Sequence, residues 1–319
     1  MQLPEKLLAA LMSEAEKHSL RLLADSREVL THRYKFREGT GQADEFIRTE
    51  DDRLTYVLSR MPATFAAVES CLTSWKNPEG CQSVLDVGAG PGTASWAALT
   101  QGMSGPFTLV ERDAGLISLG KKLATESGLA SSLWVQADLT SLPDIQAHDL
   151  VICSYALGEI PLQQRMEVLK WLWSKAKVAL LVVEPGSKAG FEVIRAGREQ
   201  LLLQGAAITA PCPHAFACPM PEGDWCHFSV RLERTPIHRY LKKGSLSYED
   251  EKFSYVLFER ISSTPTLKSR IVGYPDKHSG HLALKLCVPE GQLKKETISR
   301  KEGERYKLAK KASWGDLFI

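Results

Sequence analysis

The sequence lacks any long apolar run. Its longest strongly apolar stretch, residues 178–183, is far shorter than the roughly 18 residues that a membrane span needs, so we expect no transmembrane helix and no membrane partner. The N-terminus also lacks the basic region of a secretion signal, because its short apolar run, Leu7–Met12, is flanked by glutamates. It is neither an export signal nor an Arg-rich, acid-poor transit peptide. These absences predict a bacterial-type, cytoplasmic location.

Disulfides are not expected either. The chain has seven cysteines, an odd number, and without an export signal the default is a reducing compartment. The thiols are therefore free or bind metal. Repeats and low-complexity tracts are absent too, and the 44% hydrophobic and 24% charged content is that of a globular chain, which excludes a disordered or fibrous protein.

Short apolar runs alternate with helical stretches between residues 82 and 184. Strands that alternate with helices predict an α/β fold with a parallel sheet covered on both faces. Before this region, residues 3–24 carry apolar side chains at a helical spacing. After it, a Pro- and Cys-rich stretch without a regular period is followed by runs that alternate in period two, which predicts antiparallel strands.

A glycine-rich turn, Asp86–Gly92, lies between the first predicted strand and a helix. Glycines allow a ligand to approach the backbone closely, and the start of the helix offers free N–H groups. The turn is neither a Walker loop, since no Gly-Lys-Ser/Thr follows, nor a G-x-G-x-x-G dinucleotide loop. Glu111 ends the next predicted strand, where a carboxylate accepts hydrogen bonds from ribose hydroxyls.

The D-x-G-x-G-x-G pattern resembles motif I of the class I S-adenosyl-L-methionine (SAM) methyltransferases. The resemblance implies that Asp86 lies near the methionine end of SAM, that Glu111 holds the ribose and that Asp138 receives the adenine amino group. It also implies a SAM loop formed by three glycines: Gly88, Gly90 and Gly92.

The fourth predicted strand gives no catalytic motif. The Asn/Asp-Pro-Pro-aromatic motif of enzymes that methylate base amines is absent after Ile152. Cys153 invites comparison with the nucleophile of 5-methylcytosine enzymes, but it lacks their Pro-Cys context, and a cysteine inside an apolar strand favours a core position. Tyr155 and Glu159 are candidates to line a substrate pocket. The catalytic residues stay unassigned.

Three cysteines gather in one irregular segment, and a fourth lies at the end of a later predicted strand. A loop with so little apolar content needs something else to hold it, and a metal centre supplies that. Four thiolates fit either a [4Fe-4S] cluster or a zinc ion. His214 and His227 lie in the same segment as alternative ligands or hydrogen-bonding partners. The candidate metal ligands are Cys212, Cys218, Cys226 and Cys287.

Basic residues gather near the C-terminus. Residues 291–311 hold eight Lys/Arg against three Glu, whereas the whole chain has a net charge of only +2. A local basic patch suits a polyanion such as RNA, although a solvated lysine-rich surface gives the same pattern.

Several segments together resemble the mitoribosomal small-subunit methyltransferase-like assembly factor family and its bacterial relatives. They are VLDVGAGPGT, PCPH with the following CP and WCHF, RIVGYPDKHSGHLALKLC and the terminal WGD. The resemblance implies a Rossmann-like class I methyltransferase fold, a SAM site, a [4Fe-4S] cluster held by the four cysteines, and action on the small ribosomal subunit and its rRNA. The hypothesis is a SAM-dependent rRNA methyltransferase; its alternative is a non-catalytic assembly factor that uses SAM and the cluster structurally.

The predicted organisation has three parts. Residues 1–75 form a helical N-terminal extension, residues 76–260 form the methyltransferase-like domain with a Cys-rich insertion at 205–228, and residues 261–319 form a basic, β-rich C-terminal extension.

Overall fold

Among the described residues, three helices precede the first strand, β1. In the computed structural model, which describes residues 1–35, 47–75, 81–261 and 268–319, they are α1 (Glu5–Ala15), α2 (Leu20–Lys35) and α3 (Glu50–Thr73). The long helix α3 begins at a capping box in which Thr49 and Asp52 each accept a backbone N–H of the other. Within these ranges no helix is both long and apolar enough to cross a membrane.

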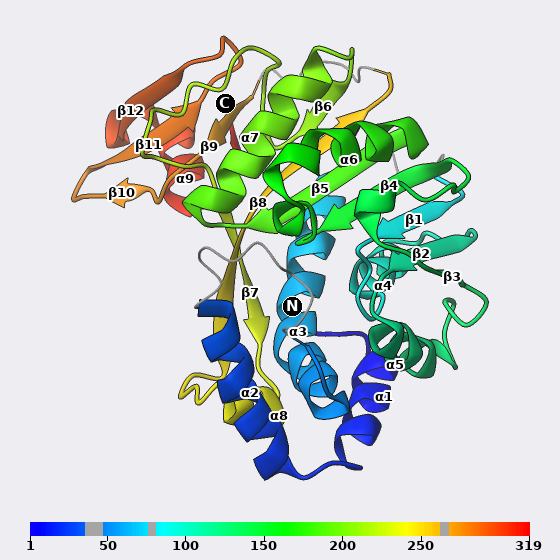
Figure 1. Cartoon of the computed structure of the whole chain (residues 1–319). Coiled ribbons are helices and arrows are strands. Elements are labelled where there is room, and N and C mark those ends of the chain that lie inside the picture. The colour runs from blue at the N-terminus through cyan, green and yellow to red at the C-terminus, as the bar shows by residue number, and fades with distance from the viewer. Residues whose placement is uncertain (36–46, 76–80, 262–267) are drawn as a thin grey trace.

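A mixed sheet in the order β3-β2-β1-β4-β5-β8-β6 forms the centre of the molecule, and β7 also pairs with β8 (Figure 1). Its strands are β1 (Val84–Val87), β2 (Phe107–Glu111), β3 (Leu133–Gln136), β4 (His148–Ser154), β5 (Ala176–Pro185), β6 (Ala207–Ala210), β7 (Phe228–Glu233) and β8 (Tyr248–Glu259). The first five strands are parallel, whereas β8 is antiparallel to β5, β6 and β7. The predicted α/β, Rossmann-like fold is therefore confirmed.

Helices cover both faces of this sheet, which is why its central strands are apolar at almost every position. Val84 and Leu150 face a core shared with α3, α4 (Thr93–Thr100) and α5 (Ala114–Ala124). Their neighbours Leu85 and Val151 face the opposite core, with α6 (Leu162–Lys175) and α7 (Lys188–Leu202). Because successive side chains of a strand point to opposite faces, the continuous apolar runs fit a sheet buried on both sides.

The C-terminal residues form a second, five-stranded sheet with its own small core (Figure 1). It contains β9 (Ser269–Ile271), β10 (Asp276–Lys277), β11 (His281–Cys287), β12 (Leu293–Ser299) and β13 (Leu317–Phe318), with α9 (Glu304–Lys311) packed against it. Strand β8 extends beyond the central sheet to pair with β7, and this arm leads to α8 (Pro236–Leu241), which packs against α2 and α3. The strands after the Cys-rich segment pair antiparallel, as their period-two pattern predicts.

Candidate functional site

The three glycines after β1 all adopt positive φ angles, but their surroundings differ. A Cβ on Gly88 would lie 2.5 Å from the Cβ of Ala156, and one on Gly92 would lie 3.0 Å from Leu109 and 3.4 Å from Trp134. Both glycines therefore allow the turn to pack tightly on the protein itself. A Cβ on Gly90 would meet no atom within 4 Å. Gly90 is thus the glycine whose missing side chain leaves room for a ligand.

Glu111, at the end of β2, holds this turn in place. Its buried carboxylate accepts the N–H of Gly90 at 2.8 Å and those of Arg112 and Asp113 at 2.9 Å each. Burial nevertheless raises the pKa of Glu111. Since two carboxylate oxygens offer about four acceptor positions, these three bonds leave about one for a ligand hydroxyl. The predicted ribose residue therefore lies beside Gly90, with most of its acceptor capacity used within the protein.

Asp86 lies at the bottom of the turn and is fully buried. Its Oδ2 accepts both the backbone N–H and the hydroxyl of Ser95 at 2.9 Å, whereas its Oδ1 has no hydrogen-bond partner in the described structure. Burial raises the pKa of Asp86 to about 7. A bound ligand that donates a hydrogen bond to this oxygen would supply the missing partner.

Asp86 gives the free protein a testable pH dependence. The native carboxyl holds its proton up to about pH 7 while the unfolded one loses it near 3.8, so the native state binds more protons between these values and stability falls as pH rises. At pH 8 the penalty reaches up to about 4 kcal/mol. We expect Asp86→Asn, which keeps the acceptor for Ser95, to lose less stability than wild type in urea unfolding between pH 5 and 8. Parallel pH profiles for the two proteins would contradict this assignment.

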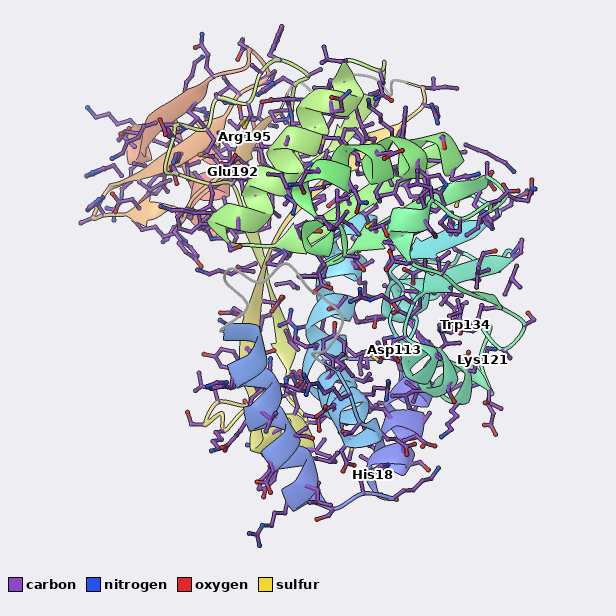
Figure 2. All side chains as sticks on the ribbon, in the orientation of Figure 1. His18, Asp113, Lys121, Trp134, Glu192 and Arg195 are labelled. Atoms are coloured by element: carbon purple, nitrogen blue, oxygen red, sulfur yellow. The ribbon has the colours of Figure 1, made fainter. Side chains whose placement is uncertain are left out.

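Asp138 follows β3 at the same edge of the sheet. It is partly exposed, accepts the N–H and hydroxyl of Thr140 at 2.8 and 2.6 Å, and lies 3.9 Å from the Arg112 guanidinium. These hydrogen bonds to the charged form lower its pKa. Trp134, labelled in Figure 2, lies on β3 against Gly120 of α5. The predicted acidic residues, near the end of β1, at the end of β2 and just after β3, thus share one edge, as the carboxyl ends of parallel strands must.

At the end of β4 the structure shows one residue in a strained conformation. Tyr155 has a φ of 56°, which costs an ordinary residue of order 1–3 kcal/mol and tends to occur at functional sites. Its hydroxyl donates to Glu251 at 3.1 Å, and Arg60 contacts the same carboxylate oxygen at 3.2 Å. Burial raises the pKa of Tyr155 well above its usual value. Cys153 is a core residue, and burial raises its thiol pKa as well.

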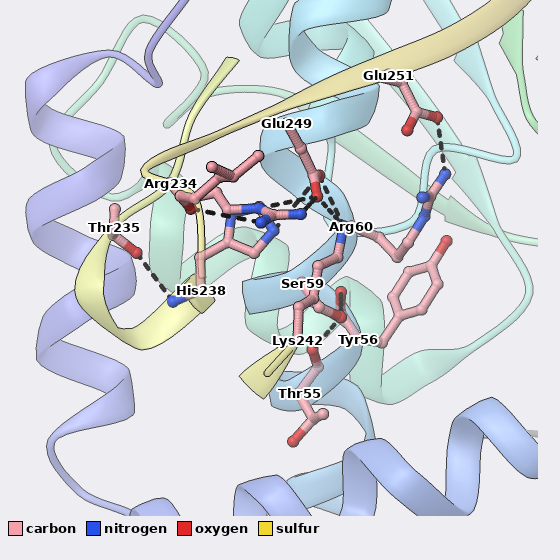
Figure 3. A network of polar contacts seen from close by, with 11 residues as sticks. Thr55, Tyr56, Ser59, Arg60, Arg234, Thr235, His238, Lys242, Glu249 and Glu251 are labelled. Atoms are coloured by element: carbon pink, nitrogen blue, oxygen red, sulfur yellow. Dashed lines mark hydrogen bonds and ion pairs between the residues drawn. The ribbon is translucent and has the colours of Figure 1, made fainter. Parts of the chain in front are cut away.

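Arg60 and Glu251 belong to a wider polar network that the sequence did not indicate (Figure 3). Glu249, two residues before Glu251 on β8, pairs with Arg234 and with Lys242, both at 2.7 Å. The network therefore ties α3 and the β7–α8 arm to β8, the strand whose Glu251 accepts the Tyr155 hydroxyl. Arg60 and Glu251 lie 191 positions apart in the chain, so no local pattern pairs them.

The four predicted metal ligands line one cavity of about 40 Å³. Burial, and then the other three cysteines, raise the pKa of Cys226 well above the usual value. Burial likewise raises the pKa of Cys218, and that of Cys287 to about 12. In the described part of the chain, however, no group of three or more His, Cys, Asp or Glu side chains is arranged to hold a metal ion. The four cysteines therefore share a cavity, and the metal centre predicted from them stays a prediction.

Two buried polar side chains face the same cavity: His214, which the sequence had placed beside the cysteines, and Arg198, which it had not. Arg198 of α7 is 2% exposed and donates through Nη2 to the carbonyls of His214 and Phe216, while its Nε and Nη1 have no partner in the described structure. The Nε2 of His214 lies 3.3 Å from the sulfur of Cys287. A buried guanidinium without compensation is costly, so the cavity suits an anionic occupant.

The basic C-terminal segment contains two kinds of cation. Arg305 pairs with Glu296 and Glu302, and Lys307 pairs with Glu304. By contrast, no carboxylate among the described residues pairs with the exposed lysines of β12 and α9, which are Lys294, Lys295, Lys310 and Lys311.

Known proteins resemble this chain along most of its length. The family described as mitochondrial small ribosomal subunit Rsm22 matches residues 50–319. The human ribosome assembly protein METTL17, mitochondrial, is 30% identical over 308 residues, which cover 89% of this chain and 66% of the relative. The Rsm22-cox11 tandem protein 2, mitochondrial, of Schizosaccharomyces pombe is 27% identical, with 86% of this chain and 44% of the relative covered. The chain thus spans less than two thirds of these relatives.

Solved methyltransferase structures are also similar to this chain, at low sequence identity. A magnesium protoporphyrin IX methyltransferase from Synechocystis, solved with SAM, is 18% identical with a TM-score of 0.41, covering 72% of this chain and 91% of that one. An O-methyltransferase family protein from Burkholderia thailandensis is 10% identical with a TM-score of 0.49, covering 77% and 73%.

The predicted cytoplasmic location is wrong. The human, fission-yeast and budding-yeast relatives are all named as mitochondrial proteins. The prediction depended on the absence of a leader pattern in the first residues. In a chain that covers only part of its relatives, those residues do not report the location of the protein.

Proposed function

Since the chain belongs to the mitochondrial small ribosomal subunit Rsm22 family, we propose that it is a SAM-binding, methyltransferase-like factor that acts on the small ribosomal subunit. The names of its relatives support ribosome assembly as the process and the mitochondrion as the location. In the proposed organisation, residues 1–75 are a helical extension, residues 76–260 carry the SAM site and the Cys-rich insertion, and residues 261–319 are the basic extension.

The open space at Gly90 carries the proposed SAM site. Gly90 leaves room at the carboxyl edge of the sheet, Glu111 retains about one acceptor position beside it, and Asp138 lies on the same edge for the adenine. Asp86, with its unpartnered oxygen, lies beneath the turn. When bound, SAM supplies an activated methyl group; these residues would bind and orient it.

The cavity lined by the four cysteines is the proposed [4Fe-4S] site. Four cysteine thiolates would hold such a cluster, and a zinc ion held by the same four thiolates is the alternative. Four thiols from two distant segments that line one cavity are the observation that supports a shared metal centre. The unpartnered nitrogens of Arg198 would compensate the negative charge of the cluster and its thiolates.

The basic C-terminal lysines are the proposed contact with rRNA phosphates. We expect joint replacement of Lys294, Lys295, Lys310 and Lys311 by alanine to weaken binding to small subunits. The slope of log affinity against log salt should flatten by about 0.7 to 0.9 for each phosphate that the protein no longer neutralises. Co-sedimentation at several salt concentrations measures this slope.

A matched control removes the same charge from another surface. Alanine at the exposed lysines of α5, α6 and β5, namely Lys121, Lys122, Lys170 and Lys177, should leave the slope unchanged. Equal slopes for wild type and the C-terminal variant would count against the contact, even if wild type binds.

One observation favours a second candidate, the non-catalytic assembly factor. At the end of β4, the Cys153 thiol is buried with a raised pKa, and the Tyr155 hydroxyl donates to Glu251 with its own pKa raised. Neither group is an activated nucleophile or base at neutral pH. Methyl transfer from labelled SAM to purified small subunits, compared with binding of the same subunits, separates the enzyme from the factor.

A further inference from the structure

Helix α3 passes the edge of the sheet at which the proposed SAM site lies. Near its start, the Arg53 guanidinium donates to both carboxylate oxygens of Asp113, just after β2, at 2.7 and 3.0 Å. Two turns later, Arg60 contacts Glu251 at 3.2 Å, and its guanidinium lies 5.7 Å from the centre of the Tyr155 ring, just after β4. In the sheet β1 lies between β2 and β4, and the glycine turn follows β1. The helix is therefore fastened on both sides of this turn.

Simple dimensions agree with this placement. Seven residues of α-helix rise about 10 Å, and two strand spacings of about 4.8 Å separate β2 from β4. The first anchor also requires a glycine, because a Cβ on Gly115 of α5 would lie 2.1 Å from the Nε of Arg53. The contact of α3 with the end of β2 is thus accommodated by a residue that has no side chain.

Tyr56 lies between the two anchors. It follows Arg53 by three residues and precedes Arg60 by four, so the three side chains share one face of α3. Figure 3 shows Tyr56 and Arg60 projecting from the helix to the same side. The carboxylates of Glu159, after β4, and Glu111, at the end of β2, both act electrostatically on Tyr56. Its side chain therefore lies between the ends of β2 and β4, beside the glycine turn.

The hydroxyl of Tyr56 has no hydrogen-bond partner among the described residues. Its ring packs against the core beneath α3, and a tyrosine with a packed ring usually has such a partner. Burial, and then the carboxylate of Glu159, raises the pKa of Tyr56 to about 12, so the hydroxyl keeps its proton at neutral pH. A hydroxyl donor without a partner, beside the glycine turn, is a position that a ligand oxygen would complete.

We propose that Tyr56 covers bound SAM from α3, with its ring against the cofactor and its hydroxyl donating to a cofactor oxygen. The ribose and the carboxylate of SAM supply such oxygens, and the carboxylates of Glu111 and Glu159 favour a cofactor that, like SAM, has a net positive charge. The inference rests on the proposed SAM site and deepens it. It gives the helical N-terminal segment a direct part in cofactor binding, because SAM makes this contact only when α3 is in place.

Calorimetric titration with SAM tests the contact. Tyr56→Phe removes only the hydroxyl, keeps the Tm of wild type and should weaken SAM binding about two- to tenfold, the effect of one neutral hydrogen bond. Tyr56→Ala removes the ring as well and should weaken binding by at least about thirtyfold, because an apolar contact is also lost. The matched controls are Tyr240→Phe and Tyr240→Ala, at a 53% exposed tyrosine of α8, and they should leave SAM affinity unchanged.

Hydrogen exchange of wild type separates a direct contact from a loss of fold. With SAM at about 100 times its Kd, the amides of residues 50–60 should exchange up to about a hundredfold more slowly, because local opening of α3 would release the cofactor. Locally opening amides of α6, which packs on the opposite face of the sheet, should exchange at the same rate with and without SAM.

Wild-type SAM affinity in both Tyr56→Phe and Tyr56→Ala would overturn the inference. So would protection by SAM that is confined to the glycine turn and does not extend to α3. In either case the binding of SAM by wild type would leave the proposed cofactor site standing. Wild-type protein that does not bind SAM at all would remove the proposed site, and the role of Tyr56 with it. The Tyr56→Phe titration and the exchange of wild type decide the question even if Tyr56→Ala does not fold.

Discussion

Replacing Cys226 with serine should remove iron and colour from the protein. Wild type purified without oxygen is expected to be brown, with about four irons per chain, because thiolate-to-iron charge transfer absorbs visible light. Burial and then the charges of the other three cysteines raise the pKa of Cys226. This thiol therefore interacts with every other proposed ligand, which makes it the best single position for the test. Iron analysis and the visible spectrum measure the loss.

The same variant should also be less stable. Cys287 lies on β11 of the C-terminal sheet, whereas Cys212 and Cys218 lie in the segment before β7, so a shared cluster would join two separate parts of the fold. Losing a structural metal centre removes the binding free energy that it contributes to folding. We therefore expect a lower Tm for Cys226→Ser than for wild type.

Cys81→Ala is the matched control. Its thiol lies outside the cavity, in the core that the central sheet shares with α3–α5, and contacts the Ser83 carbonyl at 3.6 Å. It should keep the iron, the colour and nearly all of the stability. Colourless wild-type protein with one equivalent of zinc would discard the iron-sulfur proposal and leave a four-cysteine zinc site in its place.

Features that are local in the sequence were predictable. A strand followed by Gly-x-Gly-x-Gly, with acidic residues at the ends of the next two strands, already specifies one edge of a parallel sheet, because that architecture brings carboxyl ends together. The structure agrees with this prediction, since the backbone N–H of Gly90 donates to the carboxylate of Glu111 at 2.8 Å. The sequence did not distinguish the three glycines, since only packing reveals that Gly88 and Gly92 face the protein itself.

Features that depend on distant contacts were not predictable. Arg198 has the sequence surroundings of an ordinary helix residue, and only the fold turns its guanidinium toward the four cysteines. The contact of Arg60 with Glu251 and the meeting of Trp314 with His227 likewise join segments with no shared local pattern. The cysteines were recognised as a group because of their residue type. The arginine beside them was not, because arginine is common on any helix surface.

Substituting leucine for Gly90 should abolish SAM binding while the fold persists. The substitution has two effects: strain at a φ of 54°, which costs of order 1–3 kcal/mol, and a side chain in the space proposed for the ligand. The control variant Gly102→Leu separates the strain from the overlap with the ligand. Gly102 also has a positive φ, 86°, and a Cβ there would also meet no atom within 4 Å, but it lies just after α4, away from the turn.

Gly90→Leu and Gly102→Leu should therefore lower the Tm by similar amounts, since both place an L side chain at a left-handed backbone position. Only Gly90→Leu should reduce SAM affinity, by at least about a hundredfold, because overlap with the ligand costs more than a single hydrogen bond. Glu111→Gln should also weaken SAM binding, because its NH2 group cannot accept the backbone N–H groups that the replaced carboxylate oxygen accepts. Calorimetric titration with SAM measures all three variants. Equal affinity in wild type and Gly90→Leu would place the cofactor elsewhere on the chain.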